Sequence, residues 1–474
     1  MVLNKGDVAE LKIESAAFKG KGVAKKNGIA VFVPNTAPGD VVKARIIKKK
    51  KKYREGKVLE YIELSPKRIK PKCRHALVCG GCTWQFLPYS EQLIIKEQQV
   101  RDHIERIAGL SADIVQPIIG CEQPFYYRNK MEYSFGPRRW LTDEEIQSDQ
   151  FIDDSAFAAG LHAPGRFDKI LNLQECHLQP ETSYQLLDFV RNWCIEHNLK
   201  PFDTHSNSGF IRHLVIRNSH YSDDLMVNLV TYREDNEIMV QLVPALLNKF
   251  PGITTIVNNI NDQPNPTAIG RYEKVLYGPG TITDKIGDHS FKIHANAFFQ
   301  TNTRQAEKLY SVAKKFAGLQ PDDILFDLYC GVGTLTLFTA DSVRLAVGIE
   351  LSGIAVENAI SNAAENNVSN TRFITGDMKD TFNDKLLSRF GKPDCIITDP
   401  PRSGMHPAVV KQLADLAVPK LVYVSCNPST MARDLKELSN VYETEHVQPV
   451  DMFPQTYHIE AVAGLRRRKT THSQ

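Results

Sequence analysis

The sequence predicts a multidomain protein: a small N-terminal β-barrel, a central α+β domain and a C-terminal α/β domain with a doubly wound, Rossmann-like parallel sheet. Three observations lead to this fold class. The chain has 474 residues with 42% hydrophobic side chains, which suits about three domains. Its first 72 residues hold 19 Lys and Arg against 7 Asp and Glu. From about residue 300, strand and helix patterns alternate, so we place the domains at 1–64, 65–292 and 293–474.

The first domain alternates short Val- and Ile-rich runs with turn signals. Asn-Gly, Pro-Gly-Asp and Glu-Gly turns separate these runs, so about five short strands fit and a compact barrel is expected. The stretch "GKGVAKKNGIAVFVPNTAPGDVVKARI" resembles the TRAM domain, an OB-like RNA-binding β-barrel found in several RNA-modifying enzymes. Five consecutive lysines, Lys48 to Lys52, lie in this basic module. We interpret them as a contact surface for RNA phosphates.

The cysteines predict a ligand-binding cluster at the start of the second domain. The chain has nine cysteines and no apolar export signal, so we expect free thiols and a cytoplasmic protein. The motif "CRHALVCGGC" places Cys73, Cys79 and Cys82 close together, and Cys176 is the candidate for a fourth ligand. The two intervening glycines let neighbouring sulfurs converge. Spacing alone leaves zinc and iron–sulfur equally open.

The central region mixes one long helical pattern with several strand-like runs. We predict a helix over residues 90–108, capped by Ser90 and ended by Gly109. A second helix is expected after Asn302 or Thr303. No apolar run reaches the roughly 20 residues that a membrane span needs, so we expect no membrane partner. The apolar positions of the first helix are Leu93, Ile94, Val100, Ile104 and Ile107.

The C-terminal third predicts a cofactor site. The segment "ILFDLYCGVGTLTLFTA" indicates a buried strand that turns at Gly331 and Gly333 into a helix, where backbone approaches a cofactor closely. A dinucleotide fingerprint needs a third glycine where this chain has threonine, which disfavours NAD. Later strand ends present Glu350 for ribose hydroxyls, Asp377 for an adenine amino group and Asp399 beside the same crevice. S-adenosylmethionine fits this series.

Two motifs indicate which atom receives the methyl group. "DCIITDPPRSG" contains Asp-Pro-Pro-Arg, whereas enzymes that methylate planar amines commonly carry Asn-Pro-Pro-Tyr, so nitrogen is disfavoured. A pyrimidine carbon is a poor nucleophile, and C5 becomes reactive when a thiolate adds to C6. Cys426 in "LVYVSCNPSTMARDL" ends the following strand and is the expected thiol. A base must then remove the C5 proton before the thiol leaves.

Together these motifs resemble the RNA (uracil-5-)-methyltransferase family, closest to the 23S ribosomal RNA branch that carries a TRAM domain and an iron–sulfur cluster. "CRHALVCGGC", "FFQTN", "FDLYCGVGTLTL", "DPPRSG", "SCNPSTMARDL" and "DMFPQTYHIEAV" carry the resemblance, which spans essentially the whole chain. It implies that Cys426 is the nucleophile and Glu460 the base, acting on a looped or single-stranded uridine. It also implies a [4Fe–4S] cluster on Cys73, Cys79, Cys82 and Cys176, and a methyl-donor site lined by Gln300, Tyr329, Thr334, Glu350, Asp377 and Asp399.

Three alternatives stay open. The tRNA branch resembles residues from about 290 onward but lacks the TRAM domain and the cluster, which favours ribosomal RNA. A radical methylthiotransferase also joins a TRAM domain to an iron–sulfur site, but with C-x3-C-x2-C spacing instead of the C-x5-C-x2-C found here. An RNA-binding protein with a degenerate methyltransferase domain is disfavoured because the catalytic and donor-site residues are all present. The family fold further implies that residues near 88–118 pack on the catalytic domain, and we expect a monomer.

Overall fold

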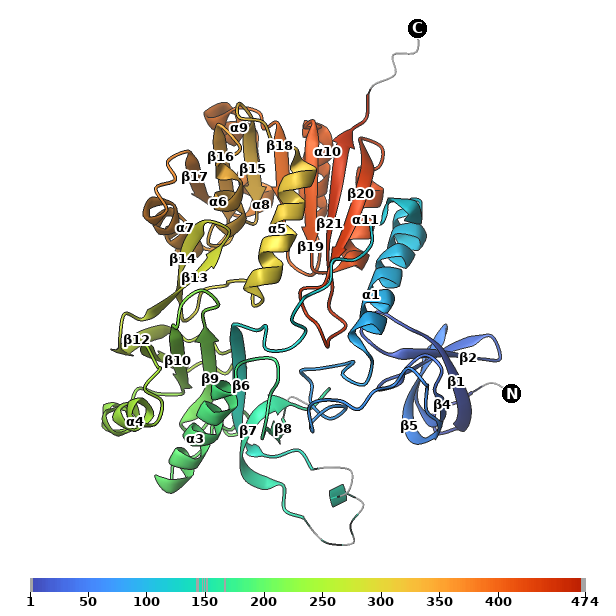
Figure 1. The fold of residues 1–474 in the computed structure, drawn as a ribbon, viewed down its shortest axis with the longest axis vertical. Helices are drawn as coiled ribbons and strands as arrows, with labels where there is room; N and C mark the ends of the chain where they lie inside the picture. Colours follow the sequence, from blue (N-terminus) through green and yellow to red (C-terminus); the bar gives the residue numbers. More distant parts are fainter. Residues whose placement is uncertain are drawn as a thin grey trace.

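A computed structural model describes residues 3–141, 145–146, 148, 150, 152–165 and 168–469. Figure 1 shows a blue N-terminal barrel, a green central sheet and, above both, an orange and red C-terminal sheet. Within the described residues, no helix is long and apolar enough to cross a membrane.

Five strands form the predicted N-terminal barrel, which is closed in the order β1-β2-β3-β5-β4. Alternate residues of each strand point inward, and Leu11, Ile13 and Val31 are among the fully buried side chains of its core. The prediction of a five-stranded barrel is confirmed. Its strands are β1 (Val8–Ala16), β2 (Gly22–Lys26), β3 (Ile29–Val33), β4 (Val41–Lys49) and β5 (Tyr53–Glu63).

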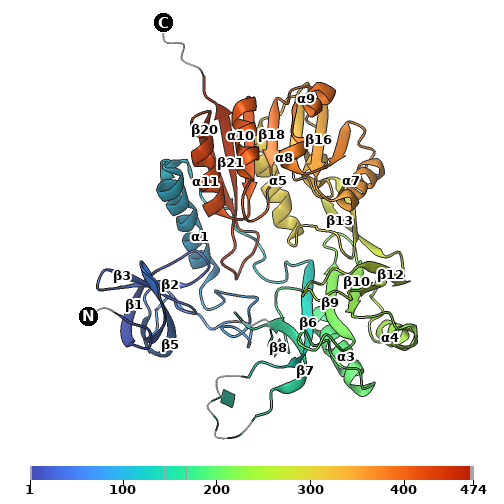
Figure 2. The same cartoon turned by 180° about the vertical axis from the view of Figure 1, so that it is seen from behind.

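After the barrel the chain forms a long helix that lies on the C-terminal domain. Helix α1 (Tyr89–His103) continues as the π-helix η1 (Ile104–Ala108) and ends at Gly109, whose φ of 71° suits a glycine. Both segments contact α11 (Pro428–Leu438), and Figure 2 shows α1 and α11 side by side. A 3-10 turn, η2 (Ala112–Ile114), follows.

Two details of α1 differ from the prediction. Ser90 is not the cap, because the helix already includes Tyr89 and its N-cap is Pro88, which makes no side-chain hydrogen bond. Ile94, which was expected to face inward, is 60% exposed, whereas Lys96 is fully buried. The helix therefore packs a partly polar face against the C-terminal domain. The spacing of its apolar residues does not predict which face is buried.

The central domain is built on a seven-stranded sheet in the order β12-β11-β10-β9-β6-β7-β8. Apart from the parallel pair β10 and β11, neighbouring strands are antiparallel. Helices α3 (Thr182–Glu196) and α4 (Asn236–Lys249) pack their apolar residues into one core with this sheet. The strands are β6 (Lys130–Arg138), β7 (Ser155–His162), β8 (Ile170–Asn172), β9 (Ile211–Asn218), β10 (Leu225–Thr231), β11 (Thr255–Ile260) and β12 (Tyr272–Tyr277).

A hairpin and a helix connect the two sheets. Strands β13 (Thr281–Ile286) and β14 (His289–His294) pair with each other. Helix α5 (Thr303–Ala317) follows, and the side chain of its N-cap, Asn302, accepts a hydrogen bond from the Gln305 amide. The predicted helix start is confirmed.

The C-terminal sheet also has seven strands, in the order β17-β16-β15-β18-β19-β21-β20. The first five in this order are parallel, so their carboxyl ends meet at one edge. The strands are β15 (Ile324–Leu328), β16 (Leu345–Glu350), β17 (Thr371–Thr375), β18 (Cys395–Thr398), β19 (Lys420–Ser425), β20 (Tyr442–Val450) and β21 (Glu460–Arg467). The helices are α6 (Thr334–Ala340), α7 (Gly353–Glu365), α8 (Met378–Thr381), α9 (Asp384–Phe390), α10 (Pro407–Leu416) and α11.

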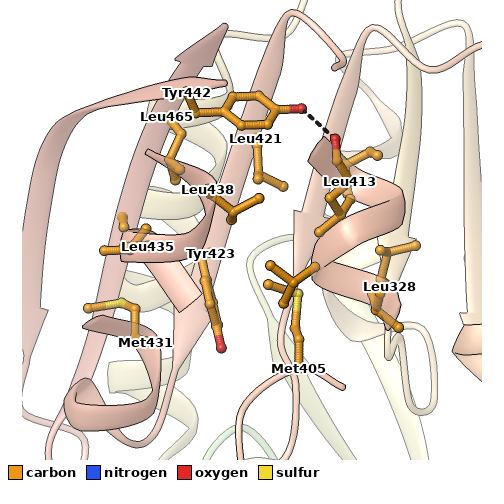
Figure 3. Packing of buried hydrophobic residues seen from close by; sticks show 14 of the residues in the cluster. Leu328, Met405, Leu413, Leu421, Tyr423, Met431, Leu435, Leu438, Tyr442 and Leu465 are labelled. Carbon is orange, nitrogen blue, oxygen red and sulfur yellow. Dashed lines mark hydrogen bonds between the residues drawn. The ribbon is translucent and has the colours of Figure 1, made fainter. Parts of the chain in front are cut away.

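The sheet is held by an apolar core that includes residues of α10 and α11. Figure 3 shows Leu413, Met431 and Leu435 from these helices packed over Tyr423 of β19. The Tyr442 hydroxyl donates to the Leu413 carbonyl oxygen at 3.2 Å, which satisfies a polar group inside this core. The core fixes the strands whose ends carry the candidate site.

Candidate active site

The first strand end forms a backbone loop beside an open space. Gly331 has a φ of 55°, and nothing lies within 4 Å of the position where a Cβ would stand. The Gly331 amide donates to Glu350 Oε2 at 3.2 Å, and the Ser352 amide donates to Glu350 Oε1 at 2.9 Å. Glu350 at the end of β16 is therefore held against the glycine loop. Gly333, the N-cap of α6, has a φ of 80° and packs against Leu337 and other side chains.

A polar group lines the same edge from the α5 side. The hydroxyls of Tyr310 and Thr334 lie 3.0 Å apart, and the Gln300 side chain hydrogen-bonds to the same tyrosine. Burial raises the pKa of Tyr310, so its hydroxyl keeps its proton and remains a donor. The structure brings Gln300 and Thr334 together through a residue that sequence analysis did not select.

Asp377 and Tyr329 lie on the next part of the edge. Asp377 is the N-cap of the short helix α8 and accepts from the Lys379 amide at 3.2 Å. The Lys379 ammonium also lies 3.3 Å from the Asp377 carboxylate. Burial raises the pKa of Tyr329 to about 12, and the nearby charge of Asp377 adds to this effect. The two predicted donor-site residues therefore lie within electrostatic reach of each other.

The predicted nucleophile and base lie at the ends of neighbouring antiparallel strands. Ser425 of β19 pairs with Ala461 of β21. One step beyond this pair, Cys426 follows Ser425 and Glu460 precedes Ala461, so the two positions are opposite each other. Burial raises the pKa of Cys426 to about 12, and the charge of Glu460 adds to it.

A third acidic group, Asp399, follows β18 at the same edge. Burial raises the pKa of Asp399 to about 7. Burial also raises the pKa of Glu460 well above its ordinary value, with a further contribution from Asp399. The charge of Arg402 acts in the opposite direction on both Cys426 and Glu460. A thiol and two carboxyl groups with little hydration are thus collected beside one cation, an arrangement suited to proton transfer.

Sequence analysis gave no role to two residues of this neighbourhood, Asp327 and His458. Asp327 is buried within β15, where Thr336 donates to its Oδ2 at 2.5 Å, and burial raises its pKa to about 7. Burial lowers the pKa of His458 to about 4, and the charge of Arg402 adds to this effect. An acid inside the apolar run "ILFDL" was the one available signal for Asp327, because a buried acid needs a reason.

The four predicted metal-binding cysteines form a separate group in the central domain. Cys73, Cys79 and Cys176 all act electrostatically on Cys82. The His75 amide lies 3.4 Å from Cys73 Sγ, the Gly81 amide 3.3 Å from Cys79 Sγ and Gln85 Nε2 3.2 Å from Cys82 Sγ. N–H donors of this kind stabilise thiolates that bind iron–sulfur clusters.

The prediction of a cluster at these cysteines is nevertheless not supported by the geometry. Across the described ranges, no group of three or more His, Cys, Asp or Glu side chains is arranged to hold a metal ion. The donor set fits a thiolate-bound group in its chemistry, since four thiols and their N–H donors are gathered in one place. It does not fit a single bound ion.

The basic barrel exposes most of its lysine run. Lys50, Lys51 and Lys52 are exposed. Lys48 lies 3.2 Å from Glu55, which is also paired with another lysine. Arg54 is 3% exposed and donates to backbone carbonyls, so it is a structural residue and not a phosphate contact. The predicted surface for phosphate contacts is therefore smaller than the number of basic residues suggests.

Comparison with known proteins identifies the family. The family model described as tRNA (Uracil-5-)-methyltransferase matches residues 222–468, and the TRAM domain model matches residues 3–59. The chain belongs to the tRNA (uracil-5-)-methyltransferase family. An uncharacterised RNA methyltransferase of Chlorobaculum tepidum is 42% identical over 98% of this chain and 97% of its own length. Another from Bacteroides thetaiotaomicron is 40% identical over 95% of this chain and 100% of its own length.

A solved structure agrees with this assignment. The tRNA (uracil-54, C5)-methyltransferase of Pyrococcus abyssi, in complex with S-adenosyl-L-homocysteine, has a TM-score of 0.74 and 28% identity. The match covers 96% of this chain and 100% of that chain. This member of the uracil-5-methyltransferase family is therefore an S-adenosylmethionine-dependent RNA methyltransferase with an N-terminal TRAM domain. These comparisons support the predicted enzyme class and the methyl donor.

Proposed function

We propose that this protein methylates C5 of one uridine in RNA, with Cys426 as nucleophile and Glu460 as base. The observation that carries the proposal is the register of β19 and β21, which puts these two residues opposite each other at the edge that also carries Asp399. In support, a cysteine and a carboxyl group on two sides of one pyrimidine ring are what addition to C6 and proton removal from C5 require.

In the proposed reaction Cys426 forms and later breaks a bond to the uracil, and Glu460 removes a proton. The Cys426 thiol gives its proton to solvent and its sulfur bonds to C6 of the uracil. The C5–C6 double bond becomes a single bond, which leaves negative charge on C5 and O4. S-adenosylmethionine, when bound, supplies the methyl group. Glu460 then takes the C5 proton, the C5–C6 double bond re-forms, and the bond from C6 to the Cys426 sulfur breaks. The high pKa of Glu460 suits it to accept this proton.

The proposed methyl-donor site joins residues from several strand ends. Glu350 is placed to accept bonds from ribose hydroxyls, beside the open space at Gly331. Asp377 would meet the adenine amino group. The charge of Asp399 acts on Cys426, so this acid lies within electrostatic reach of the proposed nucleophile. The other proposed donor-site residues are Gln300, Tyr329, Gly333 and Thr334.

We propose 23S ribosomal RNA as the substrate and tRNA as the second candidate. The preference for ribosomal RNA rests on the expectation that the tRNA branch lacks a TRAM domain and a cluster. The Pyrococcus abyssi enzyme weakens that argument, because it is named for a tRNA uracil and matches 96% of this chain. Both RNAs must therefore be tested.

A [4Fe–4S] cluster on Cys73, Cys79, Cys82 and Cys176 remains part of the proposal. Its support is the gathering of four thiols with N–H donors. Four irons keep their cysteine ligands further apart than one ion does, which is compatible with thiols that do not converge on a point. Protein purified without air should contain about four irons per chain. Cys82→Ser should lose them and Cys121→Ser should keep them; stoichiometric zinc in the anaerobic protein would contradict the cluster.

The experiment that tests the activity is a map of 5-methyluridine in 23S ribosomal RNA and tRNA from a strain that lacks this protein. One 5-methyluridine should be missing and should return with the wild-type gene. It should stay missing with Cys426→Ala, although the purified variant still binds RNA and S-adenosylmethionine. Unchanged 5-methyluridine in both RNAs would reject the proposed function.

A further inference from the structure

A cavity of about 480 Å³ lies in the central domain. None of its lining residues belongs to the proposed active site or to the four-cysteine group. Its size is within the range of sites that hold small ligands. The lining residues that matter here are Ser134, Phe135, Phe202, Thr204, Arg212 and His213.

Arg212 makes one wall of this cavity positively charged. It is 2% exposed, and its guanidinium donates to the carbonyl oxygens of three residues in the loop 261–265. Its Nε has no hydrogen-bond partner in the part of the chain that the structure describes. The carboxylate that acts on it, Asp262, is paired with Arg271 at 3.1 Å. A buried guanidinium held by carbonyls keeps its charge, so the cavity favours an anionic ligand.

Other residues of the lining offer neutral hydrogen-bonding groups. Ser134 of β6 pairs with His213 of β9, and Ser134 Oγ lies 3.3 Å from His213 Nδ1. Burial lowers the pKa of His213 to about 4, so the ring is neutral at pH 7 and has one donor and one acceptor. Neutral donor and acceptor pairs read the edges of nucleobases in single-stranded RNA.

Aromatic rings complete the lining. Phe135 and Phe202 both line the cavity. The Arg212 guanidinium carbon lies 4.1 Å from the centroid of the Phe202 ring, so the cation is stacked over one face of this ring. Bases of single-stranded RNA stack on aromatic rings and on arginine. The charge of Arg212 thus suits the phosphate of a nucleotide, the His213 and Ser134 pair suits the edge of its base, and the aromatic rings suit the face of its base.

The strand β6 connects this cavity to the active site. Asn129, just before β6, donates to the Gln300 carbonyl oxygen and to the Thr303 hydroxyl, both at 2.8 Å. Ser134 lies five positions further, which is about 17 Å along a strand. Figure 1 shows β6 leading from the C-terminal domain into the central sheet. A short stretch of extended RNA spans such a distance.

We propose that the cavity binds one nucleotide of the substrate RNA other than the target uridine, with Arg212 near its phosphate and His213 with Ser134 at the edge of its base. This inference rests on the proposed function, since it takes RNA as the substrate. It adds a specificity site: the enzyme would select a uridine by the identity of a second nucleotide nearby.

The first test fills the cavity. Thr204 is exposed and lines it, so Thr204→Trp should occupy the space without disturbing the core. With total RNA from the strain that lacks the protein, Thr204→Trp should lower kcat/KM for 5-methyluridine formation at least tenfold. The matched control is Ile195→Trp, at an exposed position of α3 outside the cavity lining, which should stay within twofold of wild type. A Thr204→Trp variant with wild-type kcat/KM would overturn the inference.

The second test needs no variant and separates this inference from the proposed function. Wild-type protein is irradiated with ultraviolet light in the presence of the same RNA, and the nucleotide adducts on its peptides are identified by mass spectrometry. Adducts on the peptides that contain Phe135 or Phe202 would support the cavity as a nucleotide site, even if no 5-methyluridine forms. Adducts found elsewhere but not on these peptides would reject the cavity, even if 5-methyluridine forms normally.

Discussion

The barrel and the C-terminal sheet carry charged groups in opposite settings. Lys50, Lys51 and Lys52 of the barrel are exposed and keep their hydration, so they cost the fold little. Asp399 and Glu460 at the edge of the C-terminal sheet have lost much of theirs, and their pKa values are raised. The lysines contribute mainly to the total positive charge of the barrel, which attracts any polyanion. In the proposed function the acids act through their positions, and each one has its own role.

The largest effect should come from the proposed base. Glu460→Gln keeps the size of the side chain but cannot take the C5 proton, so addition and methyl transfer proceed and release of the RNA fails. Multiple turnover should fall by about 10³-fold or more, in line with the loss of general-base catalysis. A denaturing gel with labelled RNA and labelled S-adenosylmethionine should show methylated RNA still attached to the protein.

The control for this prediction is the double variant Cys426→Ala, Glu460→Gln. It lacks the sulfur that forms the bond, so the shifted band should disappear. Normal turnover by Glu460→Gln alone would show that another group removes the proton.

The next effect concerns the buried cation that joins α1 to the segment leading into Glu460. The Lys96 ammonium lies 2.6 Å from Asp451, and both side chains are fully buried. Tyr89 donates to the same carboxylate at 2.8 Å. Lys96→Met leaves this carboxylate without its cation, so the free energy of unfolding should fall by about 3–5 kcal/mol. Urea unfolding followed by fluorescence measures the change.

An exposed ion pair of the same region provides the matched comparison. Lys67 lies 2.8 Å from Glu91, but its side chain is 52% exposed. Lys67→Met should change the free energy of unfolding by about 1 kcal/mol or less. If the free energy of unfolding falls equally in the two variants, burial does not increase the contribution of the Lys96–Asp451 pair to stability.

The same pair shows where sequence analysis reaches its limit. Glu350, Asp399 and Cys426 were predictable because each follows a recognisable apolar strand, and parallel strands gather their ends at one edge. The inward face of α1 was not. Lys96 is buried because its partner, Asp451, lies 355 residues away in the sequence, and no local pattern contains that information. The cavity beside Arg212 was missed for the same reason, since its lining comes from separate strands and loops.

A smaller effect should appear in the pH dependence of stability. The pKa of Asp399 is about 7 in the folded protein and about 3.8 in an ordinary setting, so the folded state holds this proton more tightly. The contribution of Asp399 to stability is therefore most favourable below about pH 4 and becomes unfavourable as the pH rises to about 7. Asp399→Asn removes the buried charge, so its thermal midpoint should exceed that of wild type by a few degrees at pH 8 and by clearly less at pH 5. A gap that is equal at both pH values would contradict the assigned pKa.

The smallest effect per residue should come from the barrel, because each of its lysines contributes only a small part of the affinity for RNA. Each lysine that contacts a phosphate of single-stranded RNA adds about 0.7 to the slope of log affinity against log salt. Replacing Lys50, Lys51 and Lys52 together by glutamine should therefore reduce that slope by about 2, while binding of S-adenosylmethionine stays the same. Filter binding of ribosomal RNA and tRNA at several salt concentrations measures the slope.

The control replaces three exposed lysines of the C-terminal domain by glutamine, which removes the same amount of charge. These lysines are Lys385, Lys392 and Lys436. If both triple variants flatten the slope equally, the barrel contributes only its share of the total charge, and the proposed phosphate surface at Lys50 to Lys52 is wrong.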